Sequence, residues 1–140
     1  MQARQTFRRI ALASMLALAL PAALAQSWPS KPVKVVVNFP PGGAADQIAR
    51  AISTPLAEAL GQPVVVENRA GANGNLGGEM VAKSPADGYT LLMSSGGMVS
   101  VNPHIYARMP FDPAKDLTAV AAAARVLVFL VAKPALPVNS

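Results

Sequence analysis

The loop Phe39 to Asp46, with the sequence FPPGGAAD, has the composition of an anion-binding turn. It lies between an apolar run, Val33 to Val37, and a helical pattern that begins near Asp46. A strand that turns through two glycines into a helix leaves backbone N–H groups free, with the positive end of the helix dipole behind them. The loop is therefore predicted to bind a carboxylate or a phosphate through main-chain donors.

Two more loops rich in glycine, serine or asparagine follow predicted strands, at Arg69–Asn75 and Ser94–Gly97. In open α/β sheets, ligands bind at the carboxyl ends of the strands. The three loops are therefore predicted to meet at one rim of a sheet. Their shared position indicates a binding site, whereas each loop alone is a weak signal.

Several of these residues have a structural interpretation beside the functional one. Asp46 is typical of a residue that caps the helix, and it could instead hold an ammonium group or a water. Gly42 and Gly43 allow positive φ angles, and they also let a ligand approach the amides. Ser94 and Ser95 either donate to a ligand or stabilise a turn. Arg69 either binds a carboxylate or tethers its own loop.

Composition excludes several other kinds of site. The chain has no cysteine and one histidine, His104, so neither a thiol nucleophile nor a histidine–cysteine metal site is expected. The run GANGNLG at 71–77 spells G-x-x-G-x-x-G, which differs from the dinucleotide fingerprint G-x-G-x-x-G. No motif for a serine nucleophile surrounds Ser94. We therefore expect no cofactor, no metal and no catalytic residue.

Periodicity predicts an α/β fold with an open, mostly parallel sheet and flanking helices. Ile48, Ile52, Leu56 and Leu60 recur every four residues, which is typical of one apolar helix face, and Gly61 is a natural stop. The predicted strands are Val33–Phe39, Pro63–Glu67, Tyr89–Ser94 and Val126–Val131, and a second helix is predicted at about Leu76–Lys83.

Residues 1–25 have the pattern of a cleaved secretory signal peptide. Three arginines precede the apolar run Ile10–Leu20, and Ala23-Leu24-Ala25 is a small-x-small cleavage site. The apolar run is shorter than the roughly 20 residues that a spanning helix needs. Residues 26–140 are then predicted to form a single unit in the periplasm. Removing the three arginines leaves nine basic and seven acidic residues, so nucleic acid is an unexpected partner.

An ordered set of short motifs runs through nearly all of the predicted mature chain. Together these motifs resemble the periplasmic solute-binding receptors of tripartite tricarboxylate transporters, often called Bug receptors. They are WPSKPV at 28–33, FPPGGxxD at 39–46, LGQPVVVENR at 60–69, GxxGNxG at 71–77, ADGYTLL at 86–92 and NP at 102–103.

The resemblance implies a two-lobed clamshell that closes on a small carboxylate and delivers it to membrane transporter subunits. It implies that residues 26–140 form an incomplete first lobe, and that the family's chain continues into a second lobe. The protein is expected to be a monomer and not an enzyme. The ligand-binding residues carried over from the family are Phe39, Pro41, Gly42, Gly43, Ala45, Asp46, Asn73, Asn75, Ser94 and Ser95.

Two other functional classes stay open. A receptor of this kind could present its ligand to a membrane signalling sensor instead of a transporter. An exported serine hydrolase that uses Ser94 or Ser95 is the other alternative. The residues do not distinguish one carboxylate from another, because backbone amides recognise any of them.

Overall fold

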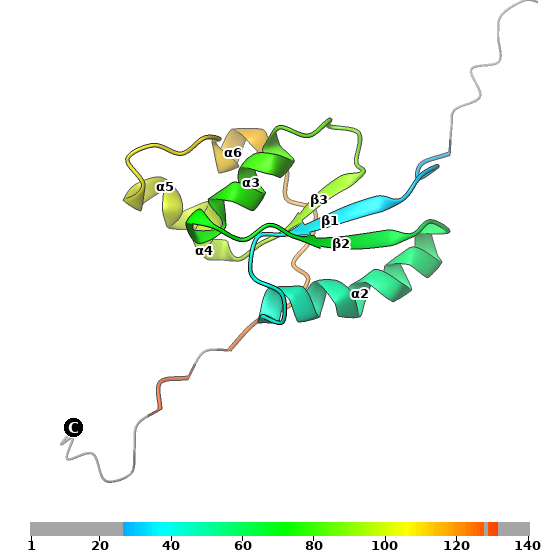
Figure 1. Ribbon diagram of the computed structural model, residues 1–140, viewed down its shortest axis with the longest axis horizontal. Coiled ribbons are helices and arrows are strands. Elements are labelled where there is room, and N and C mark those ends of the chain that lie inside the picture. The colour runs from blue at the N-terminus through cyan, green and yellow to red at the C-terminus, as the bar shows by residue number, and fades with distance from the viewer. Residues whose placement is uncertain (1–26, 128, 132–140) are drawn as a thin grey trace, which may run out of the picture.

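The computed structural model describes residues 27–127 and 129–131. The predicted signal peptide lies outside these residues. The described chain forms three strands and a series of helices around them (Figure 1). In order they are β1 (Val33–Val37), α2 (Ala44–Leu60), β2 (Val64–Asn68), the short 3₁₀ helix η1 (Ala72–Gly74), α3 (Asn75–Ala82), β3 (Thr90–Met93), α4 (Gly96–Ser100), α5 (Asn102–Ile105) and α6 (Pro113–Asp116).

The three strands form one parallel sheet in the order β2-β1-β3. Val35 of the central strand lies beside Val66 on one side and Leu91 on the other. All three strands were predicted within two residues of their bounds, and the predicted fold class is confirmed. Because the strands are parallel, their carboxyl ends lie at the same edge, and so do the loops that follow them.

Helix α2 begins after Gly43, two residues before the predicted start, and continues through Pro55 to Leu60. It ends at Gly61, whose φ of 65° lies in the left-handed region that favours glycine. The predicted apolar stripe is half-buried along the whole helix, while Pro55 is exposed. The stripe packs α2 against the sheet, as its spacing predicts.

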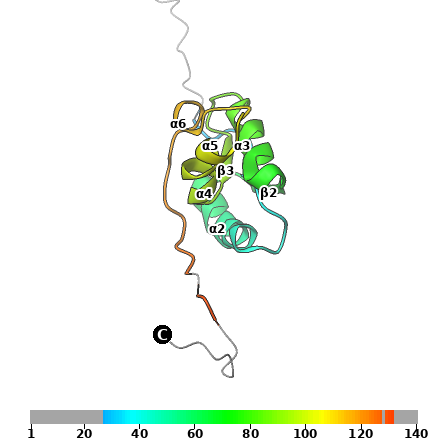
Figure 2. The same cartoon turned by 90° about the vertical axis from the view of Figure 1, so that its left-hand side faces the viewer.

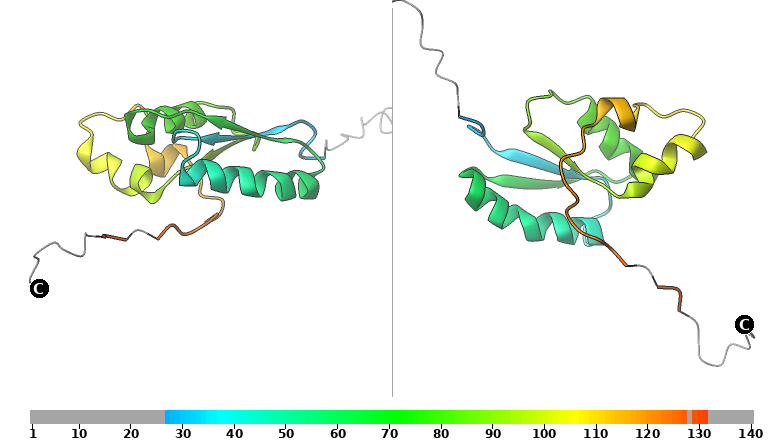
Figure 3. Two further views of the ribbon diagram at one scale, coloured as in Figure 1. Left: turned by 60° about the horizontal axis from the view of Figure 1, so that its bottom comes forward. Right: turned by 180° about the vertical axis from the view of Figure 1, so that it is seen from behind.

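Helices cover both faces of the sheet, with α2 on one face and α3 on the other (Figures 1 and 3). Val35 and Val37 form a buried cluster with Ala49 of α2. Val36, which points to the opposite face, is also fully buried. Burial on both faces explains why Val35, Val36 and Val37 of this central strand are apolar without alternation.

The fourth predicted strand, Val126–Val131, is wrong for the residues described there. Residues 126, 127 and 129–131 form neither strand nor helix, and Leu130 is fully exposed. The chain after α6 instead runs past β3 towards the start of α2 (Figure 3), along the side that carries α4 (Figure 2). Within the described residues, no helix combines the length and the hydropathy needed to span a membrane.

Candidate functional site

A cavity of about 780 Å³ lies at the carboxyl edge of the sheet. We call it the rim cavity. Its walls come from the β1–α2 loop, the first turns of α2, the end of β3 and the irregular segment 121–126. The residues that line it are Phe39, Pro40, Gly43, Ala44, Ala45, Ile48, Leu92, Met93, Ser94, Ser95, Gly96 and Ala121 to Val126.

The first turn of α2 brings backbone donors to this cavity. Gly43 precedes the helix in an extended conformation, and no side chain caps the helix start. The Gln47 N–H makes the first backbone bond of the helix, donating to the Gly43 carbonyl at 3.0 Å. The N–H groups of Ala44, Ala45 and Asp46 therefore have no acceptor within the helix. Ala44 and Ala45 line the cavity, so their donors and the positive helix end are suited to an anion.

The end of β3 adds hydroxyl groups to the same cavity. Ser94 follows the strand and Ser95 precedes α4, and both line the cavity. The Ser95 side chain makes no capping bond to α4. A serine hydroxyl that is free to donate suits a carboxylate, which can only accept when ionised.

Asp46 is buried, and its carboxylate is held within its own loop. It accepts hydrogen bonds from the Gly42 N–H at 2.9 Å, from Arg50 Nε at 3.0 Å and from Asn68 Nδ2 at 3.0 Å. The Arg50 guanidinium, followed by the Gly42 N–H and the Asn68 amide, lowers the pKa of Asp46 to about 2. The prediction that Asp46 caps the helix is wrong, because Gly43 is the residue before α2 and Asp46 is the third residue within it. Asp46 still has a structural role, since its bonds fix the loop against the start of α2.

The structure brings five of the ten predicted site residues into the cavity lining: Phe39, Gly43, Ala45, Ser94 and Ser95. Pro41, Gly42 and Asp46 belong to the same loop but are not among the lining residues. The role of all ten in ligand binding stays a prediction.

Asn73 and Asn75 lie at the same edge of the sheet but outside the cavity lining. Asn73 Nδ2 donates to Asn102 Oδ1 at 3.1 Å, and Asn102 Nδ2 donates to Asn75 Oδ1 at 2.7 Å. Asn102 is fully buried at the start of α5. These amides therefore join the second loop to α5. Arg69 has a structural partner too, because its Nε donates to Glu67 Oε1 at 2.7 Å.

Sequence reasoning missed two residues at this site. Arg125 lies in the cavity wall and is the single charged residue among the described residues that line it. Its sequence context, an alanine-rich run, gave no signal. Asn38 lies directly behind the rim and bonds to the second and third loops. The signal for Asn38 was a lone amide at the end of a mostly apolar strand.

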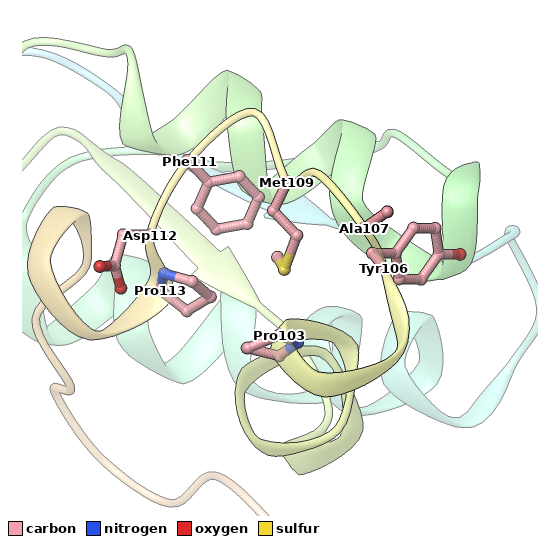
Figure 4. Close-up of a pocket in the computed structure, with 7 residues that line it drawn as sticks. All are labelled: Pro103, Tyr106, Ala107, Met109, Phe111, Asp112 and Pro113. Atoms are coloured by element: carbon pink, nitrogen blue, oxygen red, sulfur yellow. The ribbon is translucent and has the colours of Figure 1, made fainter.

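A second, smaller hollow of about 320 Å³ lies between α5 and α6 (Figure 4). The residues that line it include Tyr106, Met109, Phe111 and Asp112. No group of three or more histidines, aspartates or glutamates in the described part of the chain is placed to hold a metal ion.

Proteins of similar sequence all match over part of their own length. A protein from the tcbD–tcbE intergenic region of Pseudomonas sp. strain P51 is 44% identical over 127 residues, which cover 89% of this chain and 38% of that protein. Protein BugT of Bordetella pertussis is 43% identical over 83% of this chain and 36% of its own length. The chain therefore spans less than half the length of these relatives.

Solved structures match in the same way. An R. palustris protein determined with adipate has a TM-score of 0.60 and 44% identity, over 62% of this chain and 29% of that one. MatC from Rhodopseudomonas palustris with bound malate has a TM-score of 0.61 and 37% identity, over 64% of this chain and 30% of its own.

A family model also matches most of the chain. The model is TctC, described as the tripartite tricarboxylate transporter family receptor, and it matches residues 48–140. The sequence relatives, the solved structures and the parallel sheet agree with this match. The chain belongs to the TctC family of tripartite tricarboxylate transporter receptors.

Proposed function

We propose that this chain forms a carboxylate-binding lobe of an extracytoplasmic solute receptor that serves a tripartite tricarboxylate-type transporter. The proposal includes export through a signal peptide at residues 1–25 and a second lobe that closes over the ligand. Family membership and the adipate and malate found in two similar structures support it. Binding and release require no catalytic step.

The observation that carries the proposal is the convergence of donors at the rim cavity. The free N–H groups of Ala44 and Ala45 come from one loop, and the Ser94 and Ser95 hydroxyls come from another. One carboxylate of the ligand would accept from these groups, with the helix dipole behind the amides. Arg125, which also lines the cavity, adds a positive charge.

The cavity also suggests where the rest of the ligand lies. Ile48, Leu92 and Met93 give it an apolar wall beside the donors. A short carbon chain between two carboxylates would contact this wall while one carboxylate binds the amides. This arrangement favours a small mono- or dicarboxylate over a phosphate ester or a sugar.

Gly43→Val is the substitution that tests the proposal. Gly43 has a φ of −74°, which any residue adopts, and an added Cβ would meet only the Pro40 carbonyl, at 3.4 Å. The variant should therefore fold, while its side chain covers the amides that follow. We expect binding of adipate or malate to weaken at least about tenfold, which is about 1.4 kcal/mol of binding free energy.

Binding is measured by titrating the ¹⁵N-labelled protein with adipate or malate and following the amide resonances of Ala44, Ala45 and Ser95. Ala59→Val, which also introduces a valine but at an exposed position near the end of α2, is the control and should leave binding unchanged. Equal affinity in Gly43→Val and the wild-type protein would reject the assignment of the loop.

A further inference from the structure

Asn38 is the polar residue at the end of the buried strand β1. It is 1% exposed, and its backbone N–H donates to the Met93 carbonyl at 3.3 Å. It therefore lies beside the end of β3, on the face of the sheet that α3 covers. Asn38 does not line the rim cavity, but Ser94, next to it across the sheet, does.

The Asn38 amide gives its hydrogens to two neighbours. Nδ2 donates to Ser94 Oγ at 2.8 Å and to the Gly74 carbonyl at 3.2 Å. A carbonyl oxygen can only accept, so the Gly74 contact fixes which end of the amide is the nitrogen. Ser94 must then be the acceptor in its bond with Asn38.

This bond determines what the Ser94 hydroxyl can offer. A serine hydroxyl carries one hydrogen, and the lone pair that faces Asn38 is occupied. The hydrogen must point elsewhere, and its contact in the structure is with the Ser95 carbonyl at 3.4 Å, which is long for an O–H donor. Since Ser94 lines the cavity, its hydrogen is available to an acceptor placed there.

Glycines of the second loop and of α3 make room for Asn38. A Cβ at Gly74 would lie 2.5 Å from Asn38 Nδ2, and a Cβ at Gly77 would lie 2.7 Å from Asn38 Cβ. Two of the three glycines in the G-x-x-G-x-x-G run therefore surround this side chain. The space that Asn38 occupies therefore accounts for Gly74 and Gly77 of this run.

The Asn38 side chain occupies this position although one of its polar atoms is unpaired. Asn38 Oδ1 is buried and accepts no hydrogen bond from the described residues. An unpaired buried acceptor is unfavourable, and an apolar side chain of similar size would avoid it. Packing alone therefore does not account for asparagine here, whereas its two donors do.

We infer that Asn38 is a positioning residue that orients the Ser94 hydroxyl as a donor to a ligand carboxylate in the rim cavity. The inference rests on the proposed function and adds a residue that does not touch the ligand. The bonds would run in one direction, from the Asn38 amide to Ser94 and from Ser94 to the carboxylate. Each donor in such a chain polarises the next.

A double-mutant cycle with Asn38→Leu and Ser94→Ala tests this inference by adipate titration. Ser94→Ala removes one hydrogen bond to a charged group and should weaken binding about tenfold. Asn38→Leu should weaken binding about fivefold in the wild-type background but less than about twofold when Ser94 is already alanine. Equal factors in both backgrounds would overturn the inference.

A second measurement uses the wild-type protein and does not depend on whether Asn38→Leu folds. Adipate should shift one of the two side-chain amide proton resonances of Asn38, and this shift should disappear in Ser94→Ala. A purely structural Asn38 would show no shift on binding, or the same shift in both proteins.

The results of these titrations can contradict the inference about Asn38 without contradicting the proposed function. A wild-type protein whose Ala44, Ala45 and Ser95 amides do not respond to adipate or malate contradicts both. A protein that binds adipate, but whose Asn38 resonances and substitutions are independent of Ser94, contradicts the inference alone.

Discussion

Replacing Gly77 with alanine is predicted to destabilise the fold, although alanine is the better helix former. Gly77 lies inside α3, where alanine is favoured over glycine by about 1 kcal/mol. An added Cβ would lie 2.7 Å from Asn38 Cβ, 2.9 Å from the Arg69 carbonyl oxygen and 3.0 Å from Asn38 Cα. Two of these atoms are backbone, so a side-chain rotation cannot relieve the overlap.

The two effects can be weighed against each other. Overpacking typically costs about 1–3 kcal/mol, and contacts with rigid backbone belong at the upper end of that range. Subtracting the helix-propensity gain leaves a net destabilisation of about 1–2 kcal/mol. With a urea m-value of about 1.5 kcal/mol/M, the unfolding midpoint should fall by about 1 M.

Urea unfolding followed by far-UV circular dichroism measures this difference. Gly97→Ala in α4 is the matched control, because its Cβ would meet nothing closer than Ser95 Oγ at 3.6 Å. That control should be neutral or stabilising by up to about 1 kcal/mol. A Gly77→Ala protein as stable as the wild type would refute the close approach of α3 to Asn38.

Two further predictions concern the rim and the core. The folded pKa of Asp46, about 2, lies below its ordinary value of 3.8. The stability that the Asp46 carboxylate contributes is therefore fully present above pH 3.8, and it is lost as the pH falls towards 2. Asp46→Asn should therefore flatten the decline of the urea midpoint in this range, and an unchanged decline would contradict the network around Asp46. Val36→Ala should cost about 2 kcal/mol because Val36 is fully buried, whereas Val65→Ala, at a half-exposed strand position, should cost less than about 1 kcal/mol in the same assay. Equal losses in the two valine variants would contradict the central place of β1.

The sequence predicted the elements whose signals are local. The apolar run of β1, the four-residue spacing in α2 and the stop at Gly61 each lie within a short window, and each appears in the structure. Helix α4 was missed because it is five residues long and begins with two glycines. The strand predicted over Val126–Val131 was wrong. A high β propensity means that a residue packs well within a sheet, and among the described residues this segment has no neighbouring strand to pair with.

The position of the site could be predicted from the sequence, but most of its hydrogen-bond partners could not. Parallel strands place the three loops at one edge, and that placement is confirmed by the topology. The partners of Asn73 and Asn75 were not predictable, because Asn102 lies more than 25 residues further along the chain and no spacing rule connects them. Asn38 could have been noticed as a polar residue at the end of a mostly apolar strand, but its bond to Ser94 depends on the order of the strands.

The most direct test of the central claim is a crystal structure of the protein with adipate. The account predicts a carboxylate of adipate in the rim cavity, with its oxygens about 2.7–3.1 Å from the backbone nitrogens of Ala44 or Ala45 and from Ser94 Oγ. A diacid bound elsewhere, with the first turn of α2 and Ser94 left free of ligand, would contradict the account.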